Sequence, residues 1–383
     1  MKTAFVITAI YALVLFLNVI FIREGLGQTR TDASAVFVDE KVTYEIPMAY
    51  ELMHIAIALT DTTIVSNGYN VYNEIINRNS NYYQEVINHF KGFKNHELII
   101  ELNKSLRKSA SNLIYNVQLG NNLNFDKHRL EKVKIMPLIR RVYINLKSVN
   151  KNKVEDFARI SNFEKFYTEH QAYYDAELKN VQQNSNVNGQ QKWLETEFPT
   201  QYDNYRIIIS PLMGSTHFTQ RFKLQGQRKC IMWVASYDGN QQQLDIIEKV
   251  NYTGMVMTEI DHNYVNPVSY KYKKELKALK GGSYRTKWTN GGPTNAYKTG
   301  YSVFNEYMTH AVYLLYANKL LNASEQLIVE NSKIQGMTKR RKFIKFAEFY
   351  EQLKRLSESR LPNETIAGLY PKIIEWCKAE NGK

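Results

Sequence analysis

Cysteine is scarce in this chain: its 383 residues include two, Cys230 and Cys377, and no Cys-x-x-Cys pair. Zinc ribbons and thioredoxin-type redox sites need such pairs, so both classes are excluded. Cys230 and Cys377 could form a disulfide in an oxidising compartment. We expect instead that each is a buried, unreactive thiol, because free cysteine behaves as a small hydrophobic side chain.

Sequence patterns of two common enzyme classes are also missing. The chain has no Gly-x-Ser-x-Gly segment, which excludes the nucleophile elbow of serine hydrolases. The Gly-rich segment Gly281–Gly300 lacks the spacing of a phosphate-binding loop. We therefore expect this segment to be a loop beside the functional cleft.

Acidic residues are outnumbered by basic ones, 37 to 50, which gives a net charge of +13. Basic clusters occur at Lys271–Lys280 and Lys339–Lys342. Neither carries a motif of nucleic-acid recognition, so we predict solvated helix faces and no nucleic-acid partner. The positive charge could instead attract the protein to an acidic cell-surface polymer or to an anionic membrane in the envelope.

One long uncharged and mostly apolar run is present, Thr3–Ile22, between Lys2 and Arg23. It predicts a signal peptide over residues 1–27, cleaved before Gln28. An uncleaved anchor is the alternative, because about 20 apolar residues can cross a bilayer. Both interpretations predict an exported protein that is periplasmic, attached to the cell surface or secreted.

Hydrophobic periodicity predicts an α+β fold that is mostly helical. In a first region, residues 28–183, it indicates a strand at Ala35–Ile46, a helix at Met48–Leu59 and mostly helical structure over residues 82–183. The polar segment 184–190 predicts a loop between this region and a second one, residues 191–383.

The second region predicts a small sheet followed by helices. Its expected strands are Tyr205–Ser210 and Lys229–Ala235, both rich in β-branched and aromatic residues. No repeat of fixed period occurs, which argues against solenoids and propellers. The expected helices are Leu244–Asn263, Tyr270–Leu279, Tyr301–Leu321, Lys339–Leu356 and Glu364–Lys378.

Two pairs of side chains have the spacing of metal ligands on helices. Glu259 and His262 are three residues apart, and Glu306 and His310 are four apart, so each pair shares a helix face. Two such faces opposed to each other would make a metal site, and a set of His and carboxylate ligands suits zinc.

The segment Thr258–Pro267 resembles a family of exported bacterial proteins catalogued as a domain of unknown function and regarded as zincin-type metallopeptidases. It matches the family's His-Glu-x-x-His-x-x-Val-Asn-Pro block except at the first position. Asn305–Thr309 resembles the family's downstream Glu helix, and Tyr83–Ile99 resembles an upstream segment more weakly. The resemblance spans about residues 45 to 320 and implies a zincin-like architecture in the second region.

The resemblance also implies a function. In such a peptidase His262 and Glu306 would bind zinc, and Glu259 would act as the general base on a zinc-bound water. The chain would then be an exported zinc-dependent peptidase with a peptide or protein substrate.

Thr258 departs from this pattern, because the family has a histidine ligand there and threonine is a poor zinc ligand. Three outcomes are open. His217, in a loop after a predicted strand, could supply the missing imidazole, or Glu259 could bind the metal itself. The third outcome is a non-catalytic binding or structural protein that has lost the metal. His310 is the alternative to His217, unless it pairs with Asp261 behind the ligands.

Overall fold

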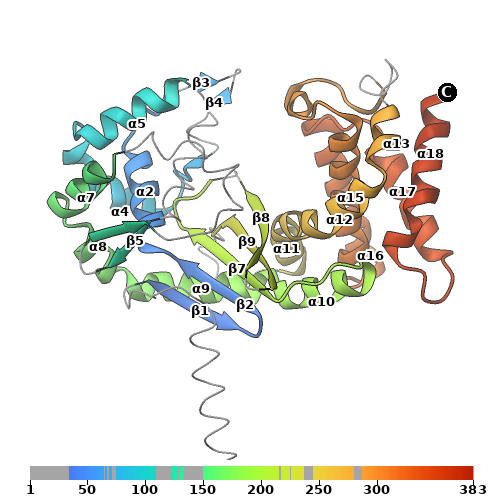
Figure 1. Ribbon diagram of the computed structural model, residues 1–383, viewed down its shortest axis with the longest axis horizontal. Coiled ribbons are helices and arrows are strands. Elements are labelled where there is room, and N and C mark those ends of the chain that lie inside the picture. Colours follow the sequence, from blue (N-terminus) through green and yellow to red (C-terminus); the bar gives the residue numbers. More distant parts are fainter. Residues whose placement is uncertain are drawn as a thin grey trace, which may run out of the picture.

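Figure 1 shows the fold in a computed structural model of the chain. The structure describes residues 34–63, 65–66, 69–70, 75–108, 123–126, 129–132, 150–214, 217–224, 226–236, 245–279 and 287–382. The predicted signal peptide or anchor, residues 1–27, and part of the predicted loop at Gly281–Gly300 lie outside these ranges. Within them, no helix has both the length and the apolar character needed to span a membrane.

A mixed sheet of five strands forms the centre of the molecule, in the order β1-β2-β7-β9-β8. The three inner strands run parallel, and the two edge strands β1 and β8 are antiparallel to their neighbours. This sheet confirms both strands predicted in the second region. The strands are β1 (Ala35–Asp39), β2 (Val42–Ile46), β7 (Asn204–Ser210), β8 (Phe218–Leu224) and β9 (Gln227–Ala235).

The prediction of one strand over Ala35–Ile46 is wrong, because this segment is a hairpin of β1 and β2. Glu40 lies in the turn with a φ of 50°, in the left-handed region. The alternation of apolar residues continues through both strands, so periodicity alone gave no sign of the turn. A second misjudged segment is the short hairpin of β5 (Leu123–Asp126) and β6 (Arg129–Lys132), in a range predicted to be helical.

The first region is otherwise mostly helical in its described part, as predicted. Helix α2 covers Met48–Ala58, close to the predicted bounds. The remaining elements are β3 (Val65–Ser66), β4 (Tyr69–Asn70), α4 (Asn81–Phe90), η1 (Lys91–Phe93), α5 (Glu97–Lys108), α7 (Lys151–Ile160), α8 (Phe163–Glu169) and α9 (Gln171–Ser185).

The predicted loop at residues 184–190 is wrong, because helix continues on both sides of a single residue. Asn186 has a φ of 49° and lies between α9 and α10 (Val187–Glu197). Asparagine tolerates this left-handed conformation, so one residue is enough to turn the chain. The central sheet takes strands from both sides of this break, and the division into two regions stays a prediction.

Helices make up most of the remaining chain, and Figure 1 shows α11 and α12 between the sheet and the C-terminal helices. Helix α15 confirms the prediction for Tyr301–Leu321, whereas α16 was not predicted. These elements are α11 (Ile246–Ile260), α12 (His262–Lys271), α13 (Lys273–Ala278), η3 (Gly292–Ala296), α15 (Gly300–Ala317), α16 (Ala323–Gln335), η4 (Gly336–Arg340), α17 (Phe346–Glu358), η5 (Ile366–Leu369) and α18 (Tyr370–Gly382).

Both cysteines are buried and carry free thiols, as expected. Cys230 lies in β9 and Cys377 in α18. Burial raises the pKa of each thiol above its usual value, which keeps both protonated and unreactive. The fold is thus held by packing, without the disulfide that the sequence left open.

Candidate functional site

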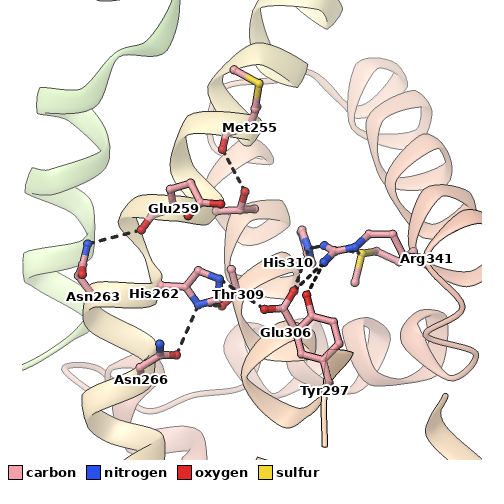
Figure 2. A network of polar contacts seen from close by, with 12 residues as sticks. Met255, Glu259, His262, Asn263, Asn266, Tyr297, Glu306, Thr309, His310 and Arg341 are labelled. Carbon is pink, nitrogen blue, oxygen red and sulfur yellow. Dashed lines mark hydrogen bonds and ion pairs between the residues drawn. The ribbon is translucent and has the colours of Figure 1, made fainter. Parts of the chain in front are cut away.

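The site lies where the end of α11 and the start of α12 face α15 (Figure 2). Both long helices begin at a capping box: Asp245 and Glu248 start α11, and Thr299 and Ser302 start α15. These reciprocal bonds satisfy free N–H groups of the first turn and fix where each helix begins. The positions of the side chains further along α11 and α15 follow from these starts.

The two helices are held in close contact by a glycine. A Cβ atom on Gly254 of α11 would lie 2.3 Å from the Cζ atom of Tyr313 on α15. The Tyr313 hydroxyl also donates a hydrogen bond of 3.0 Å to the Val250 carbonyl. Only glycine allows this approach, so Gly254 sets the distance between the site helices.

Glu259 and His262 do not share one straight helix, contrary to the prediction. Helix α11 ends at Ile260 and α12 begins at His262. Pro267 lies inside α12 and has no N–H to donate to the Asn263 carbonyl. The Tyr202 hydroxyl donates to that carbonyl instead, at 3.0 Å.

His262 and Glu306 meet across the two helices, as the predicted helix pair requires. His262 Nε2 lies 3.5 Å from Glu306 Oε1. Two ligands of one tetrahedral zinc are about 3.4 Å apart when each bond is about 2.1 Å. The other ring nitrogen of His262, Nδ1, lies 3.3 Å from Thr309 Oγ1 and 3.5 Å from Asn266 Oδ1. These contacts orient the ring so that Nε2 faces the carboxylate.

The second oxygen of Glu306 is held by an arginine. Arg341 Nη2 donates to Glu306 Oε2 at 2.9 Å and to the Tyr297 hydroxyl at 2.9 Å. Arg341 Nη1 contacts His310 Nε2, as Figure 2 shows. The cluster Lys339–Lys342 was predicted to be a solvated helix face, and this is wrong for Arg341, whose side chain is 35% exposed and points into the site.

His310 faces the same carboxylate, with Nε2 3.8 Å from Glu306 Oε2. Burial lowers the pKa of His310 well below its usual value, and the charges of Lys333 and Arg341 add to this effect. The ring is therefore neutral. Since guanidinium nitrogens only donate, His310 Nε2 accepts from Arg341 and the ring proton lies on Nδ1.

The alternative that His310 pairs with Asp261 is wrong. The Asp261 carboxyl is buried, and neither of its oxygens has a hydrogen-bond partner among the described residues. Burial raises the pKa of Asp261 well above its usual value, and nearby Glu259 adds to this effect. Asp261 is thus a buried acid behind the site, and its burial favours the protonated form.

Glu259 lies beside the His262 and Glu306 pair (Figure 2). Burial raises its pKa to about 7, the neighbouring His262 opposes this rise, and the charge of Glu306 adds to it. A carboxyl group that titrates near neutrality can accept a proton at physiological pH and return it.

Thr258, at the position of the family's first motif histidine, and His217, considered for the third ligand, are both engaged elsewhere. The Thr258 hydroxyl donates to the Met255 carbonyl of its own helix at 3.1 Å. His217 Nδ1 accepts from the Ala235 N–H at 3.2 Å, at the end of β9, and burial lowers its pKa to about 4. The structure brings His262, Glu306 and His310 together but leaves His217 outside this group.

These donors do not fit a hydrolytic zinc as they stand. Such a site needs three protein ligands and an open position. His262 and Glu306 supply two, while the free nitrogen of His310 is taken by Arg341. Among the residues that the structure describes, no group of three or more His, Cys, Asp or Glu is arranged to hold a metal ion.

The edge strand β8 passes next to the site and was missed in the sequence. The Asn263 amide donates to Thr219 Oγ1 at 2.9 Å, and Arg221 Nη1 donates to the His262 carbonyl at 3.3 Å. Phe218, Phe222 and Leu224 recur at every second or fourth position, which is the signal that could have identified β8. No comparable signal marked Arg341.

One family model, described as a domain of unknown function (DUF4932), matches residues 42–375. The match includes every residue of the site, and it confirms the part of the sequence resemblance that concerns a family of unknown function. The peptidase activity implied by the resemblance stays a prediction. No curated protein and no solved structure matches the chain.

Proposed function

We propose a function for this chain, which belongs to the DUF4932 family of domains of unknown function, from the chemistry of its site. It is an exported protein that binds extended peptides or unfolded protein segments without cleaving them, on a zincin-like helix pair that has lost its metal. The apolar run Thr3–Ile22 supports export.

The observation that carries the loss of metal is the ion pair of Arg341 with Glu306, at 2.9 Å. A buried carboxylate needs a compensating charge. In a zinc peptidase the metal supplies that charge, and here a guanidinium supplies it. Thr258, which replaces the first motif histidine, is consistent with the same loss.

The surface that supports peptide binding is the open edge of β8. The strand pairs with β9 on one side, and no further strand of the described chain pairs with its other side. An unpaired edge offers N–H and C=O groups to an extended peptide, which can add to the sheet as one more strand. Contacts of β8 with Asn263 and His262 would place such a peptide beside the site.

Incubation of the purified chain with zinc and a labelled, reduced and alkylated unfolded protein tests this function. We expect a rise in fluorescence anisotropy from binding and no fragments on a gel after prolonged incubation. Zinc-dependent fragments, or the absence of any binding, would contradict the proposal.

A second candidate is the zinc-dependent peptidase implied by the sequence resemblance. The 3.5 Å between His262 Nε2 and Glu306 Oε1 favours it, since this is the spacing of two zinc ligands. Glu259, with a pKa of about 7, would be the general base. His310 or His217 would have to complete the ligand set.

Glu259→Gln separates the two candidates. In a peptidase this variant should keep the metal and lose hydrolysis by a factor of about 100 or more. In a binding protein it should leave peptide affinity within about twofold of the unchanged chain, because Glu259 makes no bond to the peptide-binding edge. Thr258→Val, at the neighbouring position, is the matched control for a change in volume and polarity.

A further inference from the structure

The hairpin of β8 and β9 carries positive charge and no negative charge. Residues 218–235 contain no aspartate or glutamate, and their four cations are Arg221, Lys223, Arg228 and Lys229. Lys229 is buried, whereas the other three are exposed. Among the described residues, none of these three exposed cations forms an ion pair with a carboxylate. The hairpin thus presents uncompensated charge of one sign.

The three exposed cations lie on one face of the sheet and are called the basic patch here. Arg221 and Lys223 are two residues apart in β8, so both side chains point to the same face. Lys223 pairs with Arg228 of β9, and cross-strand partners share a face. On this face Arg221 Nη1 donates to the His262 carbonyl at 3.3 Å. The basic patch therefore begins beside α12 and extends to the turn of the hairpin.

The pairing of Lys223 with Arg228 is unfavourable in the chain alone. Leu224 and Gln227 close a two-residue hairpin, so the next pair, Lys223 and Arg228, is a non-hydrogen-bonded one. Side chains approach most closely in such pairs, and like charges directly opposite each other repel. The Asp203 carboxylate accepts from the Arg228 backbone N–H at 2.7 Å rather than from its guanidinium. A carboxylate supplied by a partner would relieve this repulsion.

The same residues present the backbone groups of the open edge. In non-hydrogen-bonded pairs the N–H and C=O groups point away from the partner strand, so those of Arg221 and Lys223 face outward. Among the described residues, no backbone group bonds to them from that side. Two residues along a strand span about 6.8 Å. A peptide that adds antiparallel to β8 would place every second side chain opposite these cations, on the same face.

Positive charge also limits what can pair with this edge. A second copy of β8 would bring the same cations, and like charges across a strand pair repel. Charged edge strands prevent edge-to-edge association of native proteins in this way. A segment that carries carboxylates meets no such barrier, so the edge discriminates between partners by their charge.

We propose that the open edge of β8 selects acidic extended segments, in which aspartate or glutamate at alternate positions pairs with Arg221 and Lys223. Arg228 adds to the positive potential from β9. The inference rests on the proposed function, because it names the class of peptide that the same edge binds. A peptide gains ladder hydrogen bonds as well as ion pairs, whereas an acidic polysaccharide gains the ion pairs alone.

Labelled peptides as long as β8 test this selection. One peptide alternates glutamate with valine, and its control alternates glutamine with valine, which keeps the size and removes the charge. We expect the unchanged chain to bind the glutamate peptide at least about fivefold more tightly, since each exposed ion pair contributes a modest free energy. Fluorescence anisotropy gives both affinities, and added salt should reduce the difference.

Substitutions identify the cations that are responsible. Arg221→Gln/Lys223→Gln should remove the preference for glutamate and leave the affinity for the glutamine peptide within about twofold, because the backbone edge is unchanged. Lys274→Gln/Lys277→Gln is the matched control, since it removes two exposed charges from α13 and should keep the preference. Equal effects of the two double variants would overturn the proposal.

Two further outcomes separate the possible failures. The acidic selection is also overturned if both peptides bind equally, or if polygalacturonate displaces the glutamate peptide as well as the unlabelled peptide does at equal carboxylate concentration. Peptide binding itself would stand after equal affinities. If neither peptide binds, the proposed function is contradicted and the selection with it, so the two failures are distinguishable.

Discussion

Arg341 Nη2 lies 2.9 Å from Glu306 Oε2, although 35 residues separate the two in the sequence. Glu306 is one of the two residues, with His262, that the sequence resemblance assigned to zinc. Its carboxylate is instead paired with an arginine of the chain itself, which also contacts His310. This ion pair is the reason that we propose a site in which the Arg341 side chain stands in the place of a metal.

The first prediction concerns the strength of this pair. Arg341→Ala should lower the free energy of unfolding by about 2 kcal/mol, less than for a fully buried pair because the arginine is partly exposed. Glu306→Gln removes the charge that Arg341 compensates. The double variant Arg341→Ala/Glu306→Gln should therefore lose less free energy of unfolding than the two single variants lose in sum. Denaturant unfolding of all four chains gives the coupling, and a coupling within about 0.3 kcal/mol of zero would contradict the ion pair.

The second prediction concerns the contact between the site helices. Gly254→Ala should destabilise the chain by about 3 kcal/mol, because the new methyl group overlaps the Tyr313 ring. Gly92→Ala is the control, since a Cβ at that position meets no atom within 4 Å. Thermal unfolding of both variants is the measurement. Equal midpoints for the two would show that α11 and α15 do not depend on this close approach.

The third prediction is a pH dependence far from the site. Glu51 in α2 is fully buried and accepts a hydrogen bond of 2.8 Å from the Tyr82 hydroxyl. Burial raises its pKa from 4.5 to about 7, and hydrogen bonds from Ser210 and Tyr82 oppose this rise. A pKa raised in the folded state means that the folded chain binds more protons than the unfolded chain between these two values.

Stability should therefore fall as the pH rises from about 4.5 to 7, by at most about 3 kcal/mol for this one group. Glu51→Gln removes the titration while its amide oxygen can still accept from Tyr82. As the pH rises through this range, the unchanged chain should lose stability from this group, whereas Glu51→Gln should not. We therefore expect the unfolding free energy of the variant to increase relative to that of the unchanged chain. A difference that is independent of pH would show that Glu51 titrates normally.

The fourth prediction concerns the open edge of β8. Leu224 and Gln227 form the closing pair of the β8–β9 hairpin. In a two-residue hairpin the N–H groups of the closing pair face the partner strand, and alternate residues along an antiparallel strand direct their N–H groups to opposite sides. The N–H of Arg221 consequently faces the open edge. Arg221→Pro removes this donor without breaking the ladder to β9, since proline is tolerated at outward positions of edge strands.

We expect Arg221→Pro to weaken binding of an unfolded protein at least about threefold, from the loss of one backbone hydrogen bond. Arg221→Ala keeps the N–H and controls for loss of the side chain and of its contact with the His262 carbonyl. Fluorescence anisotropy gives both affinities. Equal affinities for the two variants would place the peptide elsewhere.

The sequence predicted the elements whose periodicity is uninterrupted, such as the helix at α15 and the strands β7 and β9. It also predicted that His262 and Glu306 would meet, through the spacing of residues in a known motif. The predictions were wrong for two segments in which a single residue in a left-handed conformation turns the chain. Glu40 follows β1 and Asn186 separates two helices, and neither residue changes the hydrophobic pattern.

The role of Arg341 could not be predicted for a different reason. Its position depends on the turn after η4 and on the approach of that segment to α15, which are tertiary contacts between distant parts of the chain. In the sequence Arg341 is one of four consecutive basic residues, a pattern typical of a solvated surface. The bond of His217 to the Ala235 N–H could not be predicted for a similar reason, since it forms only when β8 pairs with β9.

The zinc content of the unchanged chain tests most directly whether Arg341 has replaced the metal. The purified protein is saturated with zinc, desalted and analysed by mass spectrometry for metals. We predict less than about 0.1 zinc per chain, because Arg341 already occupies the position between Glu306 and His310. A content of about one zinc per chain that falls on substitution of His262 by Ala would contradict it, and would favour the peptidase.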